Sequence, residues 1–191
     1  MQWRNDQGFT LLELIITIAL VGLVIAAFPF VRGMLPEIQV NKAARGLAEE
    51  LSEARSMAVK YGSDVIVAID PTLGTIKTYI DADRDGIQVG DLARSRSLAD
   101  FSATAIFRPV TTTGPDGLPI SQPVKMGTTS SPIAVTFRAN GAAVNAGIAY
   151  LTDATDHKVE LGRAVEVLTT GKVLMWRFDI NGTPGPWQKW I

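Results

Sequence analysis

Apolar residues are concentrated near the N-terminus. Residues 9–31 read FTLLELIITIALVGLVIAAFPFV, a run in which Glu13 is the only charged residue. As an α-helix rising about 1.5 Å per residue, this run would extend roughly 34 Å, enough to cross the hydrocarbon core of a bilayer. The pattern therefore predicts a membrane-spanning helix over residues 9–31.

The pattern then becomes periodic. Apolar residues recur at spacings of four, three and four on one helix face, at Leu47, Leu51, Ala54 and Ala58. This predicts an amphipathic helix over residues 32–61 that packs on a globular head and ends at Gly62 and Ser63. Pro29 and Pro36 each remove a backbone donor, so we expect a kink or a melted stretch over residues 29–36.

Beyond Gly62 the chain has the pattern of a β-rich domain. Short β-branched and aromatic runs predict strands at residues 65–70, 75–80, 103–107, 133–138, 147–152, 163–168 and 173–178. The first two flank a Pro-Thr-Leu-Gly turn, which predicts a hairpin. Residues 111–132 are rich in Thr, Gly, Pro and Ser and predict a long, partner-facing loop. The predicted fold class is α+β, a long N-terminal helix followed by a mainly antiparallel β head over residues 62–191.

Composition narrows the function classes. The 191 residues have room for one core and one extension, and the net charge of -1 gives no overall attraction to nucleic acid. The chain has no cysteine, which excludes disulfides, thiolate metal sites and cysteine nucleophiles. Its one histidine, His157, has no nearby nucleophile or second ligand in the sequence, so we do not expect an enzyme.

Glu13 gives the apolar run a more specific meaning. A carboxylate inside a transmembrane helix is costly unless it snorkels to the interface or has a partner. The segment Gly8-Phe9-Thr10-Leu11-Leu12-Glu13-Leu14 follows a short polar leader and resembles the prepilin signal of type IV pilins and type II secretion pseudopilins. A secretory signal peptide cut after Ala26-Ala27 fits less well, because the apolar run is long.

The resemblance implies specific roles for these residues. A prepilin peptidase would remove the leader, residues 1–8, by cutting after Gly8. Phe9 would become an N-methylated amino terminus, and Glu13 would neutralise the terminal amine of a neighbouring subunit. Such a pairing suits a low-dielectric helix bundle.

The rest of the chain resembles the GspH/FimT family of minor pseudopilins and minor pilins. The similar segments are residues 47–58, an aspartate-rich loop after the second strand, residues 135–141, and the turn at residues 169–173. The resemblance implies a minor pseudopilin of a type II secretion system, anchored by a single pass in the bacterial cytoplasmic membrane with its head in the periplasm, then assembled with other pilin-like subunits. The alternatives are a FimT-like minor type IV pilin for pilus biogenesis or DNA uptake, and a stand-alone membrane-anchored domain.

The aspartate-rich loop is a candidate cation site. Residues 81–86, Asp-Ala-Asp-Arg-Asp-Gly, match the first half of a calcium-loop pattern in which alternate oxygens surround the ion. The twelfth position is Leu92 where a glutamate is expected, and Asp91 lies one residue early. The sequence leaves two interpretations, calcium bound by Asp81, Asp83, Asp85 and Asp91, or a solvated acidic turn neutralised by Arg84 and Arg94.

A nucleic-acid surface is the weaker candidate. Its basic residues would be Arg163, Lys172 and Arg177, but the last 34 residues carry an excess of only two positive charges. Residues 171–174, Gly-Lys-Val-Leu, also match the family's basic DNA-binding motif poorly, so we do not expect DNA as a partner. The C-terminal tryptophans, Trp176, Trp187 and Trp190, are either a docking surface or ordinary strand-edge packing.

Overall fold

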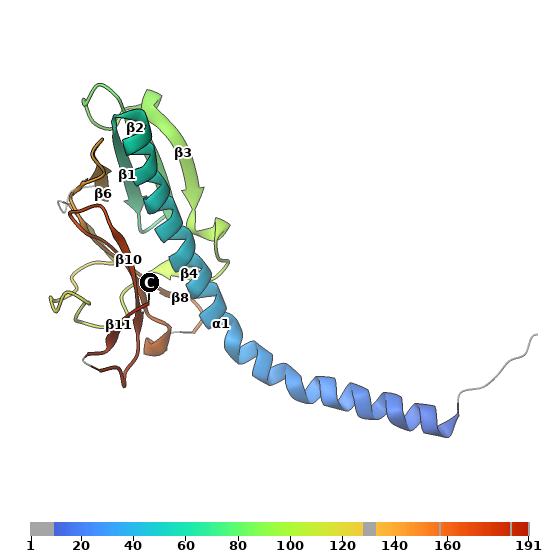
Figure 1. Cartoon of the computed structure of the whole chain (residues 1–191). Helices are drawn as coiled ribbons and strands as arrows, with labels where there is room; N and C mark the ends of the chain where they lie inside the picture. Colours follow the sequence, from blue (N-terminus) through green and yellow to red (C-terminus); the bar gives the residue numbers. More distant parts are fainter. Residues whose placement is uncertain (1–9, 128–132, 157, 184, 191) are drawn as a thin grey trace, which may run out of the picture. The chain divides into compact units, whose positions relative to one another are not determined.

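The computed structural model describes residues 10–127, 133–156, 158–183 and 185–190, and for residues 27–33 it describes the backbone alone. The chain divides into two compact units, Met1–Leu35 and Pro36–Ile191. One helix, α1 (Leu11–Tyr61), begins in the first unit and ends in the second (Figure 1). Of the two alternatives predicted for residues 29–36, the melted stretch is wrong, because α1 is continuous there and a helix can accommodate the single donor that each proline removes, while the kink stays a prediction.

The described apolar side chains of the first unit are exposed on every side of the helix. Exposure of the large apolar residues between Leu11 and Ile25 ranges from 50 to 77%. In the described part of the chain, no helical stretch is both long and apolar enough to cross a membrane. The predicted span over residues 9–31 includes Phe9 and the side chains of residues 27–31, which lie outside the description, so the span stays a prediction.

In the second unit, α1 has one fully buried apolar face. Its residues are Val40, Ala43, Ala44, Leu47, Leu51, Ala54 and Ala58, each 0% exposed. The charged Glu49 and Lys60 lie on the exposed side of the same helix. The predicted amphipathic helix is therefore confirmed, and Gly62, with φ of 66°, adopts the left-handed conformation that commonly ends a helix.

The first sheet has five antiparallel strands in the order β3-β2-β1-β6-β7. Their bounds are β1 Asp64–Asp70, β2 Thr75–Asp81, β3 Leu92–Ser97, β6 Ile133–Phe137 and β7 Ala143–Val144. Strands β1 and β2 form the predicted hairpin, with Asp70 opposite Thr75 and Asp64 opposite Asp81. The connection from β2 to β3 contains the aspartate-rich loop and the short helix η1, Val89–Asp91.

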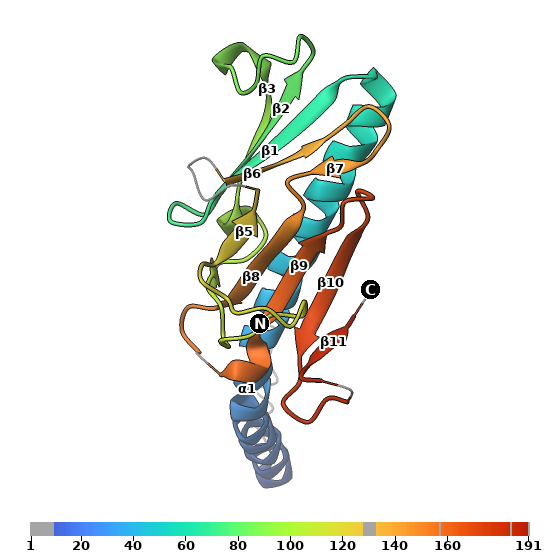
Figure 2. The same cartoon turned by 90° about the vertical axis from the view of Figure 1, so that its left-hand side faces the viewer.

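The second sheet is also antiparallel, in the order β11-β10-β9-β8-β4, and β5 pairs with β8 as well. Its bounds are β4 Ala105–Phe107, β5 Val124–Met126, β8 Gly147–Asp153, β9 Arg163–Val167, β10 Val173–Phe178 and β11 Trp187–Lys189. Two further short helices, η2 (Leu98–Asp100) and η3 (Val159–Leu161), lie in the connections. Figure 2 shows β8, β9 and β10 side by side in front of the C-terminal half of α1.

One hydrophobic core joins the helix to both sheets. It contains the buried face of α1 together with Val67 and Phe137 of the first sheet, and Leu151 and Val165 of the second. Because a single helix face covers both sheets, neither sheet has a separate core on that side. The α+β architecture predicted from the sequence is confirmed.

The seven predicted strands all exist, each within two residues of its predicted bounds. Four more strands were not predicted, namely β3, β5, β7 and β11. The predicted long loop over residues 111–132 is partly wrong, because β5 lies within it and pairs with β8. Residues 128–132 of that segment lie outside the described residues.

We expect Leu51→Ala to destabilise the head strongly. Leu51 is fully buried where α1 meets the sheets, and replacing such a side chain by alanine costs about 2–5 kcal/mol. Urea unfolding of the full chain in a non-ionic detergent, followed by circular dichroism, measures the loss. Val59→Ala on the same helix is the control, since Val59 is 55% exposed and its truncation should change stability by less than about 0.5 kcal/mol. Equal effects of the two variants would contradict the assigned core face.

Candidate functional site

The N-terminal motif is described from Thr10 onward. Gly8 and Phe9 lie outside the described residues, so the predicted cleavage and methylation site has no structural account here. Glu13 lies in the first turn of α1, where its backbone N–H donates to Thr10 Oγ1 at 3.3 Å. Glu13 therefore lies at the start of the exposed apolar part of α1.

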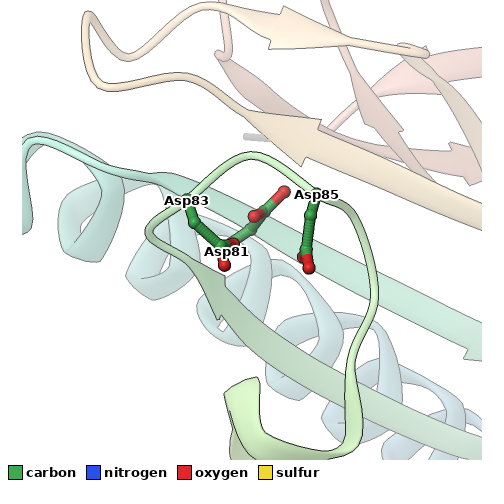
Figure 3. A group of neighbouring side chains, drawn as sticks. All are labelled: Asp81, Asp83 and Asp85. Carbon is green, nitrogen blue, oxygen red and sulfur yellow. The ribbon is translucent and has the colours of Figure 1, made fainter.

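The aspartate-rich loop follows directly from β2. Asp81 is the last residue of that strand, and Gly86 N donates to Asp81 Oδ2 at 3.2 Å, which folds the loop back on the strand end. Arg84 and Gly86 have φ angles of 64° and 100°, as a tight turn requires. The turn brings the carboxylates of Asp81, Asp83 and Asp85 together (Figure 3).

The three carboxylates could each offer one oxygen to a common ion. Their nearest oxygens lie within 4.8 Å of one another, with Asp81 buried and Asp83 and Asp85 exposed. Desolvation, followed by the negative charge of Asp83, raises the pKa of the Asp85 carboxyl. Asp91 is not one of the three carboxylates that lie within 4.8 Å of one another, although its negative charge also raises the pKa of Asp85 and its own Oδ2 is buried without a described hydrogen-bond partner. Asp91 as a fourth ligand therefore stays a prediction.

Arg94, one of the two arginines predicted to neutralise the loop, pairs with other carboxylates. Arg94 lies on β3 and forms a forked pair with Glu53 of α1, with both N–O distances at 2.5 Å. It also lies 3.4 Å from Glu50, which is buried. The hydrogen bond from Arg94 lowers the pKa of Glu53. Arg94 therefore fastens β3 to the helix and does not neutralise the aspartates.

Arg163 is a structural residue and does not form part of a nucleic-acid surface. Its side chain is 1% exposed and donates to Asn41 Oδ1 at 2.7 Å, to the carbonyls of Glu160 and Gly162 at 2.9 Å, and to Glu37 Oε1 at 3.1 Å. Burial lowers the pKa of Arg163 to about 10, so it remains cationic at neutral pH. The prediction that it binds nucleic acid is wrong for this structure, because its guanidinium is buried and all four of its described hydrogen bonds go to protein oxygens.

The other two basic candidates lie at the surface. Lys172 is exposed in the turn between β9 and β10, and Arg177 is exposed near the end of β10, where it lies 3.9 Å from Asp179. With Arg163 buried, the three do not form one basic surface.

The C-terminal tryptophans pack on the second sheet. Trp187 is 8% exposed and meets Phe178 edge to face, with ring centroids 5.3 Å apart. The Trp176 indole donates to Glu166 at 2.8 Å, and Arg45 lies over the Trp190 ring at 4.9 Å. These contacts favour the interpretation as strand-edge packing.

Arg55 is an important residue that sequence reasoning missed. Its Nε donates to the Gly141 carbonyl at 2.9 Å, and one terminal nitrogen lies 3.4 Å from the Thr170 carbonyl. These carbonyls belong to the β6–β7 turn of one sheet and the β9–β10 turn of the other. Gly141 and Gly171 have φ angles of 79° and 75°, which alanine would adopt only with strain. The only sequence signal was an arginine beside the apolar face of a helix, which is a common pattern on solvated helices.

We expect Arg163→Met to destabilise the head by about 1.5–3 kcal/mol, since buried carbonyls would lose charged donors. Urea unfolding of the full chain in detergent measures the change. Arg177→Met on the neighbouring strand is the matched control, and as a surface change it should cost less than about 0.5 kcal/mol. A stable Arg163→Met variant that had lost affinity for DNA would instead support the nucleic-acid hypothesis.

Comparisons with known proteins agree with the prepilin-like resemblance. A model described as the prokaryotic N-terminal methylation motif matches residues 3–28, and one described as type II transport protein GspH matches residues 43–171, more than half of the chain. No curated protein matches the sequence.

Two solved structures are similar at low identity. The minor pseudopilin EpsH of the Vibrio cholerae type 2 secretion system is 11% identical with a TM-score of 0.48, over 72% of this chain and 95% of that one. The Pseudomonas aeruginosa type IV minor pilin FimU is 17% identical with a TM-score of 0.43, over 70% and 85%. On the family model, which matches from the amphipathic helix to the β9–β10 turn, the chain belongs to the GspH family of type II transport proteins.

Proposed function

We propose that the chain is a minor pseudopilin of a type II secretion system, a structural subunit that joins a periplasmic filament through its N-terminal helix. The observation that carries the proposal is the pairing of two modules in one chain, an N-terminal methylation motif and a GspH head. The family is one of structural pilin-like subunits, so we propose no enzymatic activity.

The apolar helix supplies the driving force for membrane insertion and assembly. Its described side chains between Leu11 and Ile25 are exposed on every side, and a helix that is apolar all round is stable only in lipid or among other apolar helices. We propose that it lies in the cytoplasmic membrane before assembly and among the helices of neighbouring subunits afterwards. The head then faces the periplasm.

Glu13 supplies the specificity of that assembly. A lone carboxylate among apolar helices is expensive, whereas a carboxylate paired with an amine is tolerated. Cleavage after Gly8 would create such an amine at Phe9. The pairing of Glu13 with a neighbour's Phe9 amine would thus select one axial register among many apolar contacts of similar energy.

We expect the mature chain to begin at Phe9. Co-expression with a prepilin peptidase, followed by intact-mass spectrometry, should show loss of residues 1–8 and gain of one methyl group. Gly8→Val should block the cut by adding a β-branched side chain at the cleavage position. Gly22→Val is the control and should be processed normally, since a side chain there meets open space. A product cut after Ala27 would indicate a secretory signal peptide instead.

We expect assembly into the filament, and with it secretion, to depend on Glu13. A host strain lacking the chain should regain secretion of type II substrates with the wild type or with Glu49→Gln, an exposed glutamate on the same helix. Glu13→Gln should lower recovery in sheared filaments by at least about tenfold, because it leaves the neighbour's amine unpaired among apolar helices. Normal incorporation of Glu13→Gln would contradict the pairing.

The same strains distinguish a role in a type II secretion system from a role in a type IV pilus. A deletion that abolishes secretion and leaves surface pili intact supports the secretion assignment. A deletion that removes pili or DNA uptake and leaves secretion intact would overturn it in favour of a minor type IV pilin.

A further inference from the structure

We propose that the β2–β3 connection binds one calcium ion through the carboxylates of Asp81, Asp83 and Asp85. This site is separate from the N-terminal helix and does not depend on the filament role proposed above. Three observations beyond the sequence pattern carry it, namely a buried oxygen without a donor, the absence of a neutralising side chain among the described residues, and the spacing of the oxygens.

The buried oxygen is Asp81 Oδ1. Asp81 is 5% exposed, and while its Oδ2 accepts from Gly86 N, its Oδ1 has no hydrogen-bond partner in the described structure. A buried carboxylate oxygen without a partner is strongly unfavourable, so such a group usually has a ligand. Figure 3 shows the Asp81 side chain between those of Asp83 and Asp85, where a shared cation would meet it.

Among the residues that the structure describes, no lysine or arginine forms an ion pair with this cluster. Within the described residues, no lysine or arginine nitrogen lies within 4.0 Å of a carboxylate of Asp81, Asp83 or Asp85. Asp64 stands opposite Asp81 in the β1–β2 register, which adds a further negative charge nearby. Repulsion among these carboxylates would open the turn, whereas a divalent cation would turn the same charges into an attraction.

The spacing fits calcium. Calcium–oxygen distances of about 2.3–2.6 Å allow two ligands of one ion to lie up to roughly 5 Å apart, and the three carboxylates lie within 4.8 Å of one another. Magnesium demands a smaller and more regular octahedron and dehydrates reluctantly. Asp83 and Asp85 are exposed, which leaves room for water to complete the coordination. Three carboxylates plus water predict a dissociation constant on the order of 10⁻⁴ to 10⁻³ M, as in extracellular calcium modules.

The ion would stabilise the edge of the first sheet. The loop it closes leads through η1 into β3, the edge strand. β3 is fastened to α1 through Arg94 and Glu53. Calcium would therefore fix the start of the β2–β3 connection, next to the end of β2, and Arg94 fixes β3 at the end of the connection.

Titration calorimetry of the full chain in a non-ionic detergent tests the site directly. Calcium should bind with a one-to-one stoichiometry, and magnesium at the same concentration should bind at least about tenfold more weakly. Asp83→Asn and Asp85→Asn should each weaken calcium binding at least about tenfold, because each removes a charged ligand. Asp116→Asn, an exposed aspartate in another turn, should bind as the wild type does. Because Asp83 and Asp85 are exposed, these variants should fold even where Asp81→Asn does not.

Limited trypsin digestion gives a second readout. Arg84 is exposed within the loop, so calcium should slow cleavage after Arg84 severalfold, while cleavage after Lys172, exposed in the β9–β10 turn, serves as the internal reference. Absence of binding heat at millimolar calcium would overturn the proposal. Equal binding of magnesium, or undiminished binding by both loop variants, would also overturn it. Binding of calcium by a chain that fails to support secretion would support this site and contradict only the filament role, so the two proposals fail separately.

Discussion

The fold depends on one buried helix face. The residues of α1 from Val40 to Ala58 that point inward are all fully buried, and they contact strands from both sheets. Small residues such as Ala43, Ala44 and Ala54 let the helix approach the strands closely, while Leu47 and Leu51 fill the space between them. Among the described residues, no strand of one sheet pairs with a strand of the other, so this shared helix face contributes much of what holds the two sheets in one domain.

Polar contacts then set the position of the sheets along the helix. Arg55 donates to the Gly141 carbonyl in the β6–β7 turn and lies close to the Thr170 carbonyl in the β9–β10 turn. Ala143 N, at the start of β7, donates to Thr169 O in the β9–β10 turn. Near the opposite end of the packed helix, Arg163 reaches Glu37 and Asn41. Arg94 fastens the edge strand β3 at Glu53. Apolar packing holds the layers together, and these three arginines restrict how they can slide.

The sequence was a good guide to local structure and a poor guide to long-range polar contacts. Strands such as β1 and β10 carry β-branched and aromatic runs, so their pattern was sufficient to predict them. Strand β3, with the sequence LARSRS, has no buried residue and forms because β2 offers it a free edge. Arg163 was predicted to lie at the surface, because the partners that bury it, Glu37 and Asn41, are more than 120 residues away in sequence.

The contrast between two buried charges strengthens the calcium argument. Arg163 is only 1% exposed, and protein oxygens accept hydrogen bonds from three of its guanidinium nitrogens. Asp81 is buried in the same domain, yet one of its oxygens has no described donor, and the carboxylates of Asp83 and Asp85 lie close to it. A domain that satisfies one buried charge so fully would be expected to satisfy the other as well. The carboxylates of Asp81, Asp83 and Asp85 are suitable ligands for a divalent cation supplied from solution.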